Sequence, residues 1–163
     1  MTAADDFLAA AQTHQARRSG GKGLSARPER RVAVVACMDA RLDLFDILGL
    51  EVGDAHLIRN AGGVVTDDVI RSLTISQRFL GTEEIVLVHH TGCGMLGFTE
   101  DEFRAELERE VGQRPTWAAE AFSELDADVR QSMERIRTSP FLRSRDVRGF
   151  VYDVETGELR EVR

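Results

Sequence analysis

Two short segments contain both cysteines of the chain. The first reads Cys37-Met38-Asp39-Ala40-Arg41 and the second His90-Thr91-Gly92-Cys93. Thiolates and imidazole are common zinc ligands, and a site with three protein ligands keeps its fourth position open for water or substrate. We therefore predict that Cys37, His90 and Cys93 bind one Zn²⁺ and that the open position serves catalysis.

Asp39 and Arg41 decide whether such a site is catalytic or structural. Two thiolates and a neutral imidazole cancel the charge of Zn²⁺, so the ion acidifies its water less than it would with three histidines. A carboxylate beside that water can accept its hydrogen bond and orient the hydroxide, which is the role we assign to Asp39. Arg41 is expected to hold Asp39 ionised and away from the metal through a bidentate pair. The alternatives are a closed structural zinc with Asp39 as fourth ligand, or an ordinary ion pair or helix cap.

The segments around these residues alternate between predicted strands and predicted helices. Buried strands are expected at 32–36, 55–59, 84–89 and 147–154, with an antiparallel edge strand at 159–162. Helices are expected at 3–18, 42–48, 66–80, 100–111 and 117–137, the third beginning at Thr66 and the last at Thr116. This alternation is typical of an α/β domain with a parallel sheet flanked by helices.

The ligand positions also predict the order of the strands. Cys37 leaves the first strand, whereas His90 and Cys93 leave the third. These residues can share one ion only if the first and third strands are neighbours, which gives the order 2-1-3-4 with the site at the carboxyl ends. His89 is a competing ligand, but adjacent strand residues point to opposite faces, and His90 suits the short loop to Cys93 better.

Composition and charge restrict the partners and the compartment. The net charge is −7 with scattered basic residues, so nucleic acid is not expected as a partner. No segment has the length and apolarity of a membrane span, and the N-terminus lacks a leader pattern. Because thiolate ligands must stay reduced, we predict a cytoplasmic protein. The length of the chain predicts a single domain over residues 1–163, in which residues 1–25 form an N-terminal helical arm and linker.

With these residues in place, the chain resembles the β-class carbonic anhydrases. Their pattern Cys-x-Asp-x-Arg followed by His-x-x-Cys is matched without substitution, and the similarity extends through residues 58–63 and the helix at 66–80. The resemblance implies a sheet of order 2-1-3-4 and hydration of CO₂ by zinc hydroxide to give bicarbonate. It also implies that Asp39 can swing onto zinc in an inactive closed state, and that the chain forms a homodimer or a dimer of dimers in which the N-terminal helix embraces the neighbour.

Some features depart from the family or leave alternatives open. Many members have Trp in a non-catalytic bicarbonate pocket at the position of Val34, so we expect no inhibitory site of that form, although Arg59 matches another part of it. Gly62 and Gly63 fit either a close backbone approach to the substrate pocket or a turn that needs positive φ. Hydrolysis of carbon disulfide or carbonyl sulfide is the second functional reading, and a non-catalytic zinc scaffold is the third.

Overall fold

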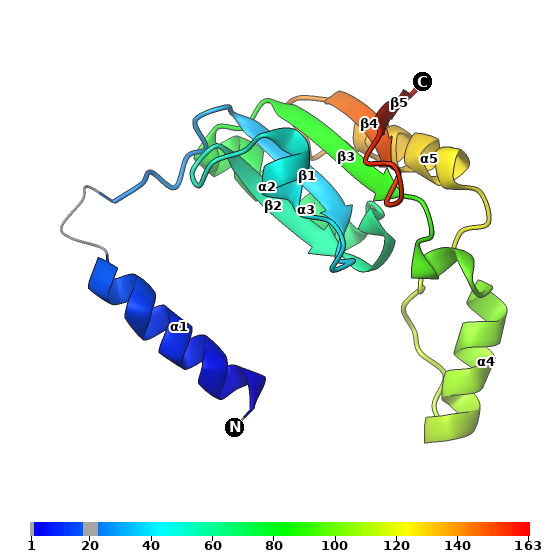
Figure 1. Ribbon diagram of the computed structural model, residues 1–163. Coiled ribbons are helices and arrows are strands. Elements are labelled where there is room, and N and C mark those ends of the chain that lie inside the picture. Colours follow the sequence, from blue (N-terminus) through cyan, green and yellow to red (C-terminus); the bar gives the residue numbers. More distant parts are fainter. Residues whose placement is uncertain (1, 18–22) are drawn as a thin grey trace.

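A five-stranded sheet of order β2-β1-β3-β4-β5 organises the protein (Figure 1). The computed structural model describes residues 2–17 and 23–163. Strands β1 (Val32–Cys37), β2 (Ala55–Asn60), β3 (Glu84–His90) and β4 (Asp146–Tyr152) are parallel, and β5 (Leu159–Val162) runs antiparallel to β4. The predicted order and the antiparallel edge strand are both confirmed.

Helices cover both faces of this sheet, in agreement with the apolar runs 32–37 and 85–88 in its central strands. Helix α3 (Asp67–Leu80) and helix α5 (Leu125–Thr138) pack on one face, and the short helix α2 (Leu44–Leu48) packs on the other. Helix α5 approaches β4 very closely at Gly149, which has no side chain. A Cβ placed on this residue would lie 2.3 Å from Cγ1 of Val129. Two one-turn helices, η1 (Ala61–Gly63) and η2 (Gly94–Leu96), follow β2 and β3 near the carboxyl ends of the strands.

Local sequence signals set the ends of several helices where they were expected. Thr66 caps α3 by accepting a hydrogen bond from the backbone N–H of Val69, and Gly81 ends the helix in a left-handed conformation. Thr99 and Glu102 form a reciprocal capping box at the start of α4 (Glu100–Val111). Asp43 caps α2, so this helix begins two residues later than predicted.

The prediction of a helix at 117–137 was wrong at its beginning. Residues 113–124 contain no helix or strand, and α5 begins only at Leu125. The carboxylate of Glu100 on α4 accepts hydrogen bonds from the backbone N–H groups of Ala119 and Glu120, and Glu120 has a φ of +61°. Glu100 thus supplies hydrogen-bond acceptors for the N–H groups of residues 119 and 120, so this segment does not need a helix to pair them.

Helix α1 (Ala3–Arg17) stands apart from the sheet in Figure 1. The side chains of residues 2–16 are all exposed, including Phe7 at 72% and Leu8 at 62%. The predicted end of this helix at residue 18 and residues 19–22 of the predicted linker lie outside the described residues. Within the described part of the chain, no helix has both the length and the apolarity that crossing a membrane requires.

Candidate metal centre

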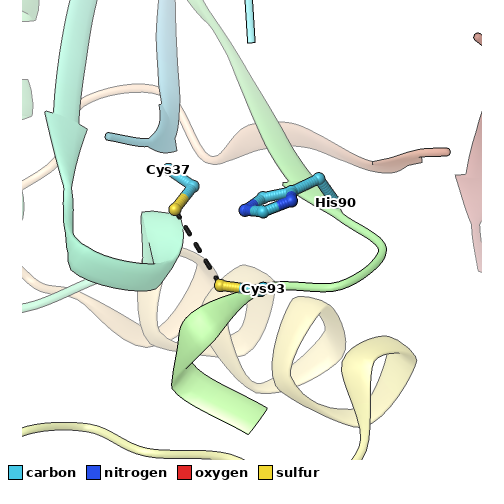
Figure 2. A group of neighbouring side chains, drawn as sticks. All are labelled: Cys37, His90 and Cys93. Atoms are coloured by element: carbon cyan, nitrogen blue, oxygen red, sulfur yellow. Dashed lines mark hydrogen bonds between the residues drawn. The ribbon is translucent and has the colours of Figure 1, made fainter. Parts of the chain in front are cut away.

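Three side chains converge at the carboxyl ends of β1 and β3. Cys37 is the last residue of β1, His90 is the last residue of β3, and Cys93 lies at the start of η2. Figure 2 shows the two sulfurs and the imidazole pointing toward one another. Their potential ligand atoms all lie within 4.8 Å of each other, and all three residues are buried. The structure therefore brings together the three residues that the sequence analysis proposed as metal ligands.

The distances and the hydrogen bonds fit a tetrahedral divalent ion. The Sγ atoms of Cys37 and Cys93 are 3.9 Å apart, and two sulfurs bound tetrahedrally to zinc at about 2.3 Å would be separated by about 3.8 Å. Nδ1 of His90 lies 2.9 Å from the carbonyl oxygen of Thr91, which can only accept, so this nitrogen carries the proton. Nε2 is buried without a hydrogen-bond partner among the described residues and is left as a metal-binding lone pair.

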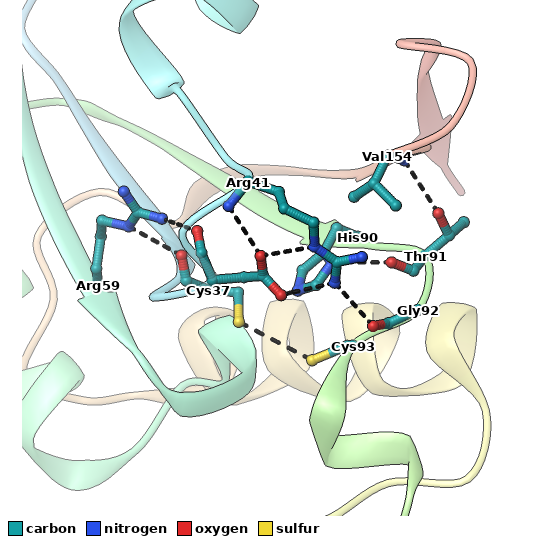
Figure 3. Close-up of polar contacts among 9 residues, drawn as sticks. Cys37, Arg41, Arg59, His90, Thr91, Gly92, Cys93 and Val154 are labelled. Atoms are coloured by element: carbon teal, nitrogen blue, oxygen red, sulfur yellow. Dashed lines mark hydrogen bonds and ion pairs between the residues drawn. The ribbon is translucent and has the colours of Figure 1, made fainter.

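A carboxylate held by a guanidinium stands beside these three residues. Nε and Nη2 of Arg41 donate to the two oxygens of Asp39 at 2.9 and 2.7 Å, and the backbone N–H of Arg41 adds a third bond at 2.9 Å. Nη2 also donates to the carbonyl oxygen of Gly92, which ties the guanidinium to the loop between the His90 and Cys93 positions (Figure 3). The nearer Asp39 oxygen is 3.7 Å from Nε2 of His90, beyond hydrogen-bonding distance.

The backbone that carries Cys37 and Asp39 is held by Arg59. Its Nε donates to the carbonyl oxygen of Cys37 at 2.9 Å, and its Nη2 donates to that of Asp39 at 2.7 Å (Figure 3). Sequence reasoning had noted Arg59 only for its match to a bicarbonate pocket and missed this contact, because the two segments are 22 residues apart. Arg59 thus sets the position of both the first sulfur and the carboxylate.

The side chains of the site perturb one another's protonation. The hydrogen bond shared with Cys93 is the main cause that lowers the pKa of Cys37 to about 4, and the same bond raises the pKa of Cys93. Burial disfavours a charged His90, but the adjacent Cys37 thiolate outweighs this effect and raises the pKa of His90. The Arg41 guanidinium keeps the pKa of Asp39 well below its usual range. A divalent cation bound by these three residues would displace the Cys93 thiol proton, so metal affinity is expected to rise with pH.

His89, the competing ligand, points away from this cluster. It is fully buried on the opposite face of β3, where its Nε2 lies 2.7 Å from an Asp128 oxygen on α5. The alternation of side chains along the strand therefore separates the two histidines as predicted. Asp128 was not anticipated, since nothing in its local sequence distinguishes it from the other acidic residues of α5.

The Gly62-Gly63 pair makes the close turn that follows β2. Both glycines have positive φ, at +81° and +71°. A Cβ on Gly63 would lie 2.7 Å from the backbone nitrogen of Cys37, so a larger residue would displace the end of β1. The turn geometry and the close approach together account for the glycine at 63.

The fold and the cluster define a class of protein: an α/β protein whose parallel sheet carries a Cys-His-Cys metal-binding group at its carboxyl edge. The particular family follows from comparison with known proteins. The sequence profile of the carbonic anhydrases matches residues 32–120. "Beta-carbonic anhydrase 1" of Mycobacterium tuberculosis is 55% identical over 164 residues, covering 99% of both chains. The chain therefore belongs to the β-carbonic anhydrase family of enzymes.

Solved structures and other relatives agree with this assignment. A carbonic anhydrase of Streptococcus mutans superposes with a TM-score of 0.92 at 43% identity, covering 100% of this chain and 99% of that one. A carbon disulfide hydrolase of Acidithiobacillus thiooxidans is 36% identical over 153 residues, covering 80% of this chain and 76% of its own. Among more distant proteins of the same fold, β-carbonic anhydrases of Sordaria macrospora are tetrameric, at 19% identity and a TM-score of 0.62.

Proposed function

We propose that the chain is a zinc enzyme that reversibly hydrates CO₂ to bicarbonate, with one Zn²⁺ per subunit held by Cys37, His90 and Cys93. The observation that carries this proposal is the juxtaposition of the three ligand atoms with a carboxylate that is held by Arg41. A zinc ion in this place supplies a Lewis acid that makes hydroxide available from water near neutral pH.

The protein's own contribution is to orient the water and to keep the fourth metal position accessible. Asp39 is ionised and accepts hydrogen bonds only. It would therefore select a water or hydroxide that donates to it, and would orient a lone pair of that oxygen toward the substrate. The bidentate pair with Arg41 uses both carboxylate oxygens. This restraint supports a catalytic site over a closed scaffold, because a carboxylate that is permanently bound to metal needs no such restraint.

Gly62 and Gly63 are proposed as part of the substrate pocket, on the basis of their place next to the cluster. The turn brings the backbone against the first ligand, and the nearby Met95 and Phe122 side chains lie close to Gly62. An apolar wall beside the proposed metal position suits a small uncharged substrate such as CO₂.

Stopped-flow measurement of CO₂ hydration by the zinc-loaded protein at alkaline pH tests the proposal. We expect a rate well above the uncatalysed reaction that falls strongly in the Asp39→Asn variant, while an Asp68→Asn variant on the exposed surface of α3 keeps the wild-type rate. The absence of CO₂ hydration in a zinc-loaded, folded protein would reject the proposal.

Hydrolysis of carbon disulfide or carbonyl sulfide is the second candidate function. It is favoured by the 36% identity to the carbon disulfide hydrolase, and the same ligands and dyad would serve it. Assays of all three substrates on one preparation decide between the two, and we expect CO₂ to have the highest kcat/KM.

We also propose that the protein is a cytoplasmic homodimer, or a dimer of dimers, in which α1 packs on a neighbouring subunit. An isolated helix of 15 residues is marginal in water, and α1 exposes Phe7 and Leu8. Reduced thiol ligands favour the cytoplasm. A Phe7→Glu/Leu8→Glu double variant should lower the mass measured by light scattering to that of a monomer, whereas a variant that stays dimeric would count against α1 as the contact.

A further inference from the structure

Four arginines surround a hollow at the end of the sheet opposite the metal centre. The hollow has a volume of about 370 Å³, and its lining includes Arg27, Arg31, Arg78 and Arg143. It adjoins the beginnings of β1 and β3, so the length of a six-residue strand, about 20 Å, separates it from the metal ligands. Nothing in the proposed CO₂ chemistry uses these residues.

The charge of this hollow opposes that of the chain. The protein has a net charge of −7, yet the residues that line the hollow include four arginines and one acidic residue, Glu83. That carboxylate is already paired with Arg31. The remaining positive charges repel one another, and a bound anion would remove this repulsion.

Three of the arginines are positioned by contacts to other elements. Arg78 donates through Nε and Nη2 to the carbonyl oxygen of Phe141, at 3.1 and 2.7 Å. Arg31 has a φ of +56°, rare for a side chain of its size, and its Nε donates to the carbonyl oxygen of Gly81. The backbone N–H of Arg143 donates at 2.8 Å to Oε1 of Gln77, which is only 5% exposed.

Hydrogen-bond donors are left over for a ligand. In the described ranges 2–17 and 23–163, the guanidinium groups of Arg27 and Arg143 have neither a hydrogen-bond acceptor nor an ion-pair partner, and each offers five N–H groups in a planar fork. The negative end of the α3 dipole offsets only part of the positive charge of the four arginines, because a helix terminus carries about half an elementary charge. Arg78, in the last turn of α3, already interacts with this terminus.

We propose that this hollow binds a multiply charged oxyanion, either free phosphate or pyrophosphate or the phosphate group of a small metabolite. Planar guanidinium forks match phosphate oxygens in bidentate fashion. The volume lies at the small end of ligand sites, which range from about 300 to 1,000 Å³, so a small anion fits better than a macromolecule.

Titration calorimetry on the full-length zinc-loaded protein tests this proposal, with inorganic phosphate, pyrophosphate and AMP as the probes. We expect at least one of them to bind, with an affinity that falls as salt is added. The Arg27→Ala and Arg143→Ala variants should each weaken that binding by about tenfold or more, because each removes charge-assisted hydrogen bonds. The matched control is Arg109→Ala, whose side chain is 75% exposed on α4 and which should bind as the wild type does. Tighter binding of pyrophosphate than of AMP identifies a free anion as the ligand, and the reverse order identifies a phosphorylated metabolite.

Three results would overturn the proposal. They are the absence of binding at millimolar concentrations of all three probes, binding that survives in the Arg27→Ala/Arg143→Ala double variant, and loss of CO₂ hydration in step with the binding heat. The last result would place the anion at the metal centre. Circular dichroism and the CO₂ hydration rate of each variant, both expected at the wild-type level, establish that the variants are folded.

Discussion

Replacing Arg41 by methionine tests how the proposed active site keeps Asp39 away from the metal. The substitution preserves much of the side-chain volume but removes two of the three hydrogen bonds to the Asp39 carboxylate, those at 2.9 and 2.7 Å. The third bond comes from the backbone N–H of residue 41 and remains. Because Oδ2 of Asp39 loses its bond to Nη2 of Arg41, the carboxylate is expected to compete for the fourth metal position.

Losing a partner that orients a group beside a metal site costs about 10- to 100-fold in activity. Because the backbone bond survives, we expect a fall in kcat/KM for CO₂ near the lower end of this range, on the order of tenfold. The Arg71→Met variant is the matched control, since its guanidinium pairs with Asp68 on the exposed surface of α3. Its kcat/KM should equal that of the wild type.

A double-mutant cycle makes the reasoning refutable. If Arg41 acts through Asp39, then Arg41→Met should cost nothing further in an Asp39→Asn background. Stopped-flow rates of the wild type, both single variants and the double variant supply the four values. Losses that multiply, so that the double variant is slower by the product of the two single effects, would show that Arg41 acts independently of Asp39.

Three further predictions concern packing, pH and metal removal. A Gly149→Ala substitution should lower the free energy of unfolding by about 1–3 kcal/mol in urea titrations, because its Cβ would overlap Val129; an unchanged midpoint would contradict this close contact. The Arg160 side chain lowers the pKa of Asp126, so this pair should stabilise the fold above the unfolded pKa of about 3.9 and lose that contribution as pH falls through the lower folded value. Acid unfolding of Arg160→Gln should therefore begin at a higher pH, and coincident curves would refute the pairing. After chelation, thiolate absorbance of Cys37 should persist down to a pH of about 4, and its loss near the ordinary thiol pKa would contradict the shared hydrogen bond.

Much of the fold was predictable because its signals are local. The apolar runs of β1 and β3, the cap at Thr66 and the stop at Gly81 each depend on residues within a few positions of one another. The 2-1-3-4 order was also predictable, since two distant ligand segments can share an ion only if their strands are neighbours. The beginning of α5 was not predictable, because Glu100 binds the amides of residues 119 and 120 from another helix.

The sequence by itself determined which residues could bind a metal and on which strand ends they lie, because ligand chemistry and strand alternation are properties of residue type and spacing. It also separated His90 from His89. Only the tertiary structure decided how these groups are held: Arg59 fixes the backbone of Cys37 and Asp39 from β2, and Asp128 engages His89 from α5. Such contacts join residues far apart in the chain, and their geometry exists only after the sheet and the helices have packed.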